Sequence, residues 1–163
     1  MINIYYAVFV AFLVAPSVCF PDSSEESYGE LMDIMTSEHR EGVYSDYLEA
    51  IEDDYPEAKS GDPGAMYRLY KNFNLLANIY GIQGARGYSI AWLRRAAGLK
   101  YPDALKDLGY IYKNGYETVG IEKDLVKAAS YFKEAWEGGD MSAKSEYNYI
   151  VECEIPDEKA WDC

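Results

Sequence analysis

Residues 104–143 read ALKDLGYIYKNGYETVGIEKDLVKAASYFKEAWEGGDMSA, and this stretch decides the fold. Small residues alternate in it with large ones at spacings of three, four and seven. Its first half has the pattern A-x-x-x-L-G-x-x-Y-x-x-G, and its second half has K-A-x-x-Y-x-x-x-A-x-x-x-G-x-x-x-A. This arrangement is typical of two helices that pack closely, because Ala and Gly leave room for the large side chains of the neighbouring helix.

The pattern recurs along the chain with a period of 39 residues. Ala65, Ala104 and Ala143 fall in register at this period. Small residues otherwise align with small ones and large with large; the columns include Leu69 with Leu108 and Tyr147, Phe73 with Tyr112, Gly81 with Gly120, Ile82 with Ile121, Trp92 with Tyr131, Ala96 with Ala135, Ala50 with Ser89 and Ala128, and Gly61 with Gly139. Lys100 interrupts the last column in the middle copy. A period of this length is typical of repeat proteins.

These residues resemble the Sel-one-like repeat (SLR) family of tetratricopeptide-related helix–turn–helix units. The resemblance is good over residues 104–143, fair over 65–103 and faint over about 44–64. It implies an all-α fold, an α/α solenoid with a right-handed superhelix of antiparallel helix pairs, in which two clear repeats follow a degenerate one. It also implies a protein-binding role, and the family motif carries no catalytic residues.

The chain departs from the family pattern at several points. Tyr70 stands where the family has a helix-packing Gly, and longer loops at residues 79–87 and 116–124 replace the Gly-x-Gly-Val turn. Pro56 is expected to interrupt the earliest unit, either by starting a new turn or by kinking the helix, because proline removes a backbone donor from a helix. We expect Ser89 to begin one helix, Pro102 the next, and Asp124 and Asp140 to cap the last two.

Composition and charge indicate the size of the domain and the kind of partner. The 163-residue chain suits one domain, and 49% hydrophobic residues are enough for a core. Its net charge of −13 argues against a nucleic-acid partner, which would require a basic surface. The 17 Tyr serve either as core filler or as a binding surface.

The first residues carry the features of an export signal. Residues 4–15 form an uncharged apolar run, too short to span a bilayer and suited to the core of a signal peptide. An uncleaved anchor and a lipid-modified Cys19 are the alternatives. The expected organisation is a signal peptide at 1–19, an acidic lead-in with a short helix at 20–43, the repeat domain at 44–151 and a C-terminal cap or tail at 152–163. The mature protein is then periplasmic or secreted, with no membrane contact.

The few cysteines and the single histidine of the sequence argue against a catalytic cysteine or a His-rich site. After signal removal, Cys153 and Cys163 are an even pair in an oxidising compartment, which predicts a disulfide; two free thiols at the terminus are the alternative. His39 is the single histidine in the sequence, so a His-rich metal site is excluded. No phosphate-binding loop is present either. We expect no catalytic residue, no cofactor and no metal.

The exposed side of the first helix in each repeat is the predicted partner-binding surface. In helical solenoids these helices line the concave side. The candidate residues are Tyr67, Tyr70, Lys71, Asn74, Lys106, Tyr110, Lys113 and Asn114, of which Tyr110 is the strongest. The expected function is that of a monomeric, non-catalytic protein-binding module. Its expected role is that of an immunity protein, or inhibitor, which acts against a secreted antibacterial effector such as a phospholipase. The first alternative is a structural scaffold subunit, and the second is an enzyme that binds or hydrolyses β-lactams.

Overall fold

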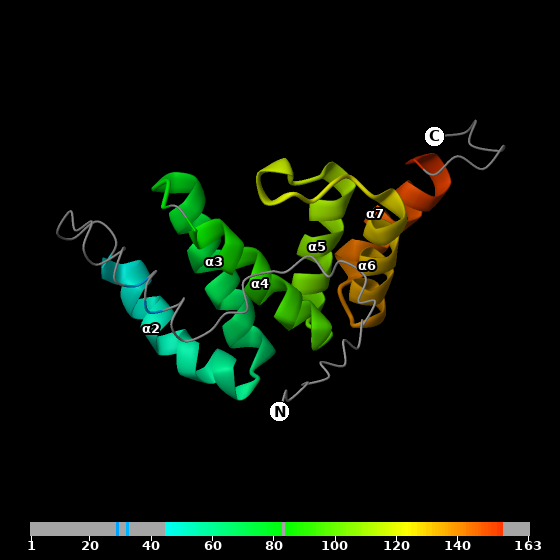
Figure 1. Cartoon of the computed structure of the whole chain (residues 1–163). Helices are drawn as coiled ribbons and strands as arrows, with labels where there is room; N and C mark the ends of the chain where they lie inside the picture. Colours follow the sequence, from blue (N-terminus) through cyan, green and yellow to red (C-terminus); the bar gives the residue numbers. More distant parts are fainter. Residues whose placement is uncertain (1–28, 30–31, 33–44, 83, 155–163) are drawn as a thin grey trace, which may run out of the picture.

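The computed structural model describes residues 29, 32, 45–82 and 84–154. Helices occupy most of this part of the chain, and no strand occurs in it. The elements are α2 (Ser45–Ser60), α3 (Pro63–Ile79), α4 (Ala85–Gly98), α5 (Pro102–Asn114), the short 3₁₀ helix η1 (Glu117–Val119), α6 (Leu125–Glu137), α7 (Met141–Tyr149) and the π-helical turn η2 (Ile150–Glu154). Figure 1 shows them side by side, in the order of the sequence.

Each α-helix packs mainly against the helices before and after it in the chain. The pairs α3–α4 and α5–α6 are the two clear repeats, and α2 and α7 flank them (Figure 1). We call α3, α5 and α7 first helices, and α2, α4 and α6 second helices. The expectation of an all-α solenoid built from antiparallel helix pairs is confirmed; the handedness of its superhelix stays a prediction.

The alanine columns of the repeat lie in the core. Ala65, Ala104 and Ala143 are all fully buried. Among the large residues, Phe73, Trp92 and Phe132 are at most 2% exposed. Because the period reproduces both the small and the large positions, each helix pair buries the same stripe against its neighbours.

The second helices end in the same way. Gly61, Lys100 and Gly139 all have positive φ angles, of 105°, 62° and 106°. The backbone N–H of the residue after each one donates to the carbonyl five residues earlier, at 3.1 Å after α2, 3.1 Å after α4 and 2.9 Å after α6. This is the Schellman motif, in which a left-handed residue closes the helix.

First helices begin with proline or aspartate. Pro63 and Pro102 stand at the first position of α3 and α5, where a missing N–H costs nothing. The side chain of Asp62 accepts from the backbone N–H of Ala65 at 2.6 Å. Asp140 starts α7, and Asp124 caps second helix α6, as expected, each by a bond to a backbone N–H in the first turn.

One expected helix boundary was wrong, and Pro56 lies inside a helix instead of starting a new turn. Helix α4 begins at Ala85, four residues before Ser89, because Gly84 at φ 86° turns the chain into the helix. Helix α2 continues through Pro56 to Ser60. Pro56 is exposed, and the residues Leu48, Ile51 and Ala58 of the same helix are buried. The buried stripe therefore holds α2 together on both sides of the proline, and the missing hydrogen bond lies on the solvent side.

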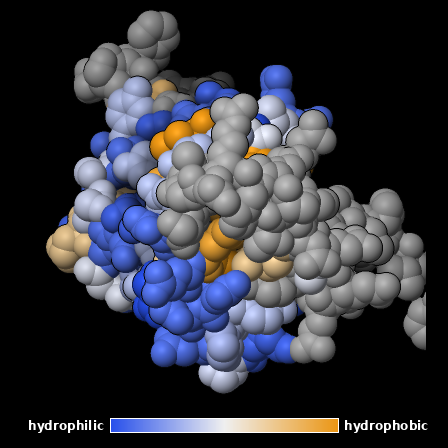
Figure 2. All heavy atoms as spheres, turned by 90° about the vertical axis from the view of Figure 1, so that its left-hand side faces the viewer, coloured by the Kyte–Doolittle hydropathy of each residue, from blue (hydrophilic) through white to orange (hydrophobic). Residues whose placement is uncertain are grey.

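The outer side of α2 is strongly hydrophilic. Asp46, Glu49, Glu52, Asp53 and Glu57 are exposed on it. Figure 2 views this end of the molecule and shows mostly hydrophilic residues around a smaller hydrophobic area. The acidic residues of this helix therefore form a solvated face.

Several sequence predictions concern residues outside the described part of the chain. These are the signal peptide at 1–19, nearly all of the acidic lead-in at 20–43, and the tail from residue 155 onward. Cys153 is described and disulfide-bonded. Its predicted partner Cys163 is outside the described residues, so that pairing stays a prediction. None of the helices described is long and apolar enough to cross a membrane.

Candidate functional site

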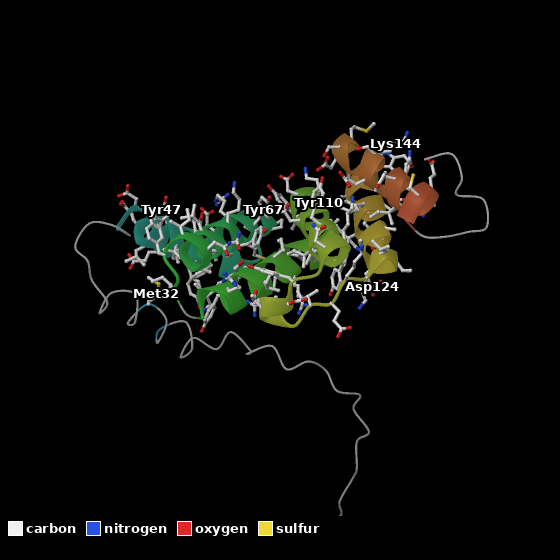
Figure 3. The ribbon with its side chains drawn as sticks, turned by 90° about the horizontal axis from the view of Figure 1, so that it is seen from above. Met32, Tyr47, Tyr67, Tyr110, Asp124 and Lys144 are labelled. Atoms are coloured by element: carbon white, nitrogen blue, oxygen red, sulfur yellow. The ribbon has the colours of Figure 1, made fainter. Side chains whose placement is uncertain are left out.

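The predicted partner-binding residues lie on first helices α3 and α5. Figure 3 shows Tyr67 and Tyr110 along one side of the molecule, and Asp124 on the opposite side. Tyr110 is 39% exposed, and Lys71 and Asn114 are exposed as well. The other five candidates, Tyr67, Tyr70, Asn74, Lys106 and Lys113, are half-buried.

A groove of about 240 Å³ lies between these two helices. Four of the eight predicted residues line it: Tyr70, Asn74, Tyr110 and Asn114. Asn78, Ile90, Ile111, Gly115 and Tyr116 complete its lining. We call this set the α3–α5 groove. Ile90 is 2% exposed, so the second helix α4 contributes the floor and the first helices contribute the walls.

One side of the α3–α5 groove is fixed by a carboxylate on α5. The Tyr67 hydroxyl donates to Asp107 Oδ2 at 3.0 Å, and the rings of Tyr67 and Tyr70 are 5.5 Å apart. Burial raises the pKa of both tyrosines, and the nearby charge of Asp107 raises the pKa further. Burial also raises the pKa of Asp107, although hydrogen bonds from the two tyrosines oppose this. Tyr67 therefore connects α3 to α5.

A second carboxylate connects α5 to α7 in the same way. Glu146 accepts from the Tyr110 hydroxyl at 3.1 Å and pairs with Lys113 at 3.0 Å. Burial raises the pKa of Tyr110, and its bond to Glu146 adds to the effect. Asp107 and Glu146 are 39 residues apart, so the repeat places an acidic acceptor at the same position of consecutive first helices.

Lys106 also forms an ion pair at the start of the next first helix, α7. Its ammonium pairs with Asp140 at the start of α7 and with Asp103 at 3.6 Å. The hydrogen bond to Asp140 raises the pKa of Lys106, while partial burial opposes the rise. Burial likewise opposes the lowering of the Asp140 pKa, but bonds from Lys106 and Ser142 prevail. Lys106 is therefore primarily a structural contact between repeats.

The asparagines retain hydrogen-bonding capacity. Asn78 Nδ2 donates to Asn74 Oδ1 at 2.9 Å, and Asn78 Oδ1 accepts from the Arg86 guanidinium at 2.7 Å. Arg86 also lies over the ring of Tyr116 at 5.5 Å. Among the described residues, Asn114 makes no side-chain hydrogen bond. Sequence reasoning missed Asn78 and Tyr116, although Asn78 continues the four-residue spacing of Tyr70 and Asn74 and could have been found by it.

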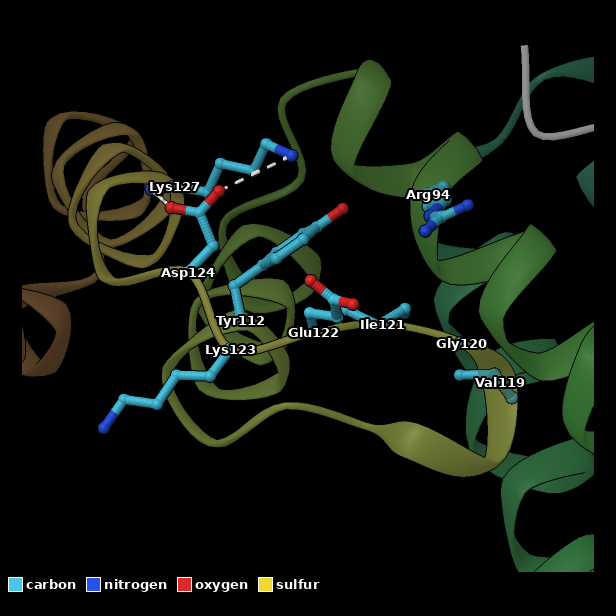
Figure 4. Close-up of a pocket in the computed structure, with 9 residues that line it drawn as sticks. All are labelled: Arg94, Tyr112, Val119, Gly120, Ile121, Glu122, Lys123, Asp124 and Lys127. Carbon is cyan, nitrogen blue, oxygen red and sulfur yellow. Dashed lines mark hydrogen bonds and ion pairs between the residues drawn. The ribbon is translucent and has the colours of Figure 1, made fainter. Parts of the chain in front are cut away.

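A larger pocket of about 580 Å³ lies beside α4, α5 and the loop before α6. Figure 4 shows the Tyr112 ring and the Glu122 carboxylate on the side of Arg94, whereas Lys123 points away from them. Lys127 pairs with Asp124 at 3.6 Å and lies over Tyr112 at 5.2 Å. Cations and carboxylates are mixed in this pocket, so it favours no single kind of ligand.

The basic residues around α4 do not form one site, because each has a different partner. Arg95 lies over the ring of Trp92 at 4.9 Å, and Lys100 pairs with Glu134 at 2.7 Å. Arg86 turns to Asn78 instead. In the described part of the chain, no three His, Cys, Asp or Glu residues are grouped so as to hold a metal ion.

Comparison with known proteins supports the helical-repeat fold. No protein-family model matches the chain, and no curated protein matches it significantly. Among solved structures, the chain is similar to the Sel1 repeat protein from Oxalobacter formigenes, at 29% sequence identity and a TM-score of 0.53. The match covers 62% of this chain and 71% of that one.

Proposed function

Because this chain is built from Sel-one-like helical repeats, as its sequence predicts, we propose that it is a protein-interaction module whose partner binds along the first helices. The surface for this interaction is the α3–α5 groove with the exposed residues around it. The role is a non-catalytic one, in which the protein covers a surface of its partner.

The groove between consecutive first helices is the observation that carries this proposal. It brings together two Tyr and two Asn from the predicted set, on helices that are fixed relative to each other by the Tyr67–Asp107 bond. Tyrosine gives a large amphipathic contact area and loses little conformational entropy on binding. A rigid groove with such walls is well suited to hold part of another protein.

The proposed setting is outside the cytoplasm. The apolar run at residues 4–15 and the predicted Cys153–Cys163 pair favour an exported protein. A compact acidic repeat protein of this kind fits an immunity protein or inhibitor that neutralises a secreted effector, such as a phospholipase. Its net charge of −13 would accelerate association with a basic partner.

The test is titration of the purified protein with the effector encoded by the neighbouring gene. We expect a one-to-one complex with a dissociation constant below micromolar. Asn114→Arg should weaken it by tenfold or more, because a bulky cation on this exposed position would block the groove.

Ser130→Arg is the matched control. It introduces the same side chain at an exposed position of second helix α6 and should leave the affinity unchanged. Equal effects of the two substitutions, or no complex with the effector or with any protein from a periplasmic extract, would contradict the proposal. Polymers of the chain in light scattering would favour a scaffold subunit.

A further inference from the structure

We propose that the C-terminal segment, residues 155–163, folds back over the open side of α7 and closes the helical array at that end. The open side of α7 is the side that a further second helix would cover, and it consists of Lys144, Asn148 and, in the continuing turn η2, Val151. This surface is distinct from the α3–α5 groove, and the inference does not rest on the proposed function. Three observations carry it: the repeat register, the polar groups on the open side and the bonded state of Cys153.

The repeat register identifies the side of a first helix that meets its own second helix. In α5, Gly109 lies against a phenylalanine ring of α6, and Tyr112 stacks on Tyr131 with the ring centroids 5.5 Å apart. The residues 39 positions later are Asn148 and Val151. No second helix follows α7 in the described residues, and Val151 is 43% exposed. This side of α7 therefore lacks the helical neighbour that the same side has in the two clear repeats.

The open side of α7 is more polar than the matching side of α5. Lys144 is exposed, whereas Leu105, the residue 39 positions earlier, is 1% exposed. The Lys144 ammonium lies over the Trp136 ring at 4.8 Å and forms no ion pair with a carboxylate of the described residues. An apolar helix from a second copy of the chain would bury this charge and the amide of Asn148 without partners, which is unfavourable. The surface therefore favours an occupant that brings carboxylates of its own.

The composition of the C-terminal segment matches this surface. Residues 155–163 read IPDEKAWDC, with three acidic residues and one lysine, so the segment is opposite in charge to Lys144. Trp161 adds a large ring with a single N–H donor, which suits a surface made of a valine and an amide carbonyl. Pro156, near the start of the segment, disfavours a continuation of the helix. The segment can therefore pair with the lysine and cover Val151 at the same time.

The disulfide ties the segment to the end of the array. Cys153 is disulfide-bonded, and once the signal peptide is removed, Cys163 is the one other cysteine in the sequence. Such a bond holds the two Cα atoms about 4.4–6.8 Å apart. Trp161 and Val151 each precede their cysteine by two residues, a span of at most about 7 Å. The bond therefore brings the Trp161 ring within reach of Val151.

Trypsin cleavage after Lys159, followed by mass spectrometry of the oxidised mature chain, tests the inference. Trp161→Ala keeps the disulfide but removes the ring that covers the open side, so it should accelerate this cleavage by tenfold or more. Trp161→Phe retains an aromatic ring and should keep most of the protection. Val151→Glu removes the other half of the contact and places a negative charge beside the acidic segment, so it should also accelerate the cleavage.

Val126→Glu is the matched control, since Val126 is 70% exposed on α6 and lies outside the open side of α7. It should leave the cleavage rate unchanged, and thermal unfolding of all variants checks that they are folded. Equal cleavage of the wild type and Trp161→Ala, or peptide mapping without reduction that joins Cys153 to a cysteine other than Cys163, would overturn the inference. A dimer of the oxidised chain in light scattering that Val151→Glu dissociates would overturn it too, because a second copy would then cover the open side.

Discussion

Lys100 shows how strongly the repeat imposes its backbone on individual residues. Among the described residues it is the one non-glycine with a positive φ, at 62°. The corresponding residues one repeat away in each direction are Gly61 and Gly139, which need no such strain. A side chain in this left-handed conformation costs about 1–2 kcal/mol. The Schellman bond from Tyr101 to the carbonyl of Ala96 is formed in spite of it.

Lys100→Gly is therefore expected to stabilise the protein by about 0.5–1 kcal/mol. The substitution removes the strain and loses the exposed ion pair with Glu134, which contributes only about 0.2–1 kcal/mol. Urea unfolding measures the change. Lys100→Ala removes the same ion pair without relieving the φ angle, so it should be neutral or slightly destabilising. A less stable Lys100→Gly variant would contradict the interpretation.

At the scale of the elements, α5 and α6 approach closely because Gly109 has no side chain. A Cβ atom placed on Gly109 would lie 2.7 Å from Phe132 Cε1, and Phe132 is fully buried. In the preceding repeat the corresponding positions hold Tyr70 and Leu93. The departure of Tyr70 from the family glycine therefore coincides with a smaller residue at the position of Phe132, and it places a ring in the α3–α5 groove.

Gly109→Ala should destabilise the protein by about 1–3 kcal/mol, because α5 and α6 must separate or Phe132 must leave its position. The matched control is Gly87→Ala in α4, where no atom lies within 4 Å of the added Cβ. This control should stabilise the protein by about 0.5–1 kcal/mol, since alanine is the better helix former. Thermal and urea unfolding compare the two, and effects of the same sign would contradict the packing argument.

At the scale of the whole molecule, consecutive first helices are joined by polar bridges, of which the one at Asp107 is half-buried and the one at Glu146 is exposed. Asp107 links α3 to α5, and Glu146 links α5 to α7. Because each bridge contacts only the next repeat, the array gains its stability from neighbour to neighbour. The Asp107 bridge also joins the two helices that form the walls of the α3–α5 groove. The acids are thus part of the architecture that presents the candidate site.

The pH dependence of stability should reveal the Asp107 bridge. Its folded pKa is raised above the ordinary 3.8, mainly by burial, so the stability that it contributes is largest at low pH and falls as pH rises through the folded value. Asp107→Asn removes the ionisable group, and with it the fall in stability at rising pH. It retains an oxygen that can accept the hydrogen bond from the Tyr67 hydroxyl. The stability of the variant relative to the wild type should therefore increase between pH 4 and pH 7 in urea unfolding.

Asp140→Asn is the control of opposite sign. The pKa of Asp140 is lowered, so its contribution is present above the unfolded pKa and is lost as pH falls. The cost of Asp140→Asn should be larger at pH 7 than at pH 4. Parallel pH profiles for Asp107→Asn and Asp140→Asn would show that the two carboxylates do not differ in the way described.

The sequence by itself determined the repeat, the helix pairs and most of the helix ends, because the period of 39 residues fixes which small and large residues meet, and Asp, Pro and Gly act locally at helix ends. It also placed four residues of the α3–α5 groove on the correct helices. Only the tertiary structure decided which polar groups are already paired. Tyr67, Lys106 and Lys113 bind acids that lie 33 to 40 residues away along the chain, and such contacts depend on how the repeats stack. Local sequence patterns do not show which residues of neighbouring repeats come into contact. The side chains that make no such contact, and so can bind a partner, could therefore be identified only once the helices were packed.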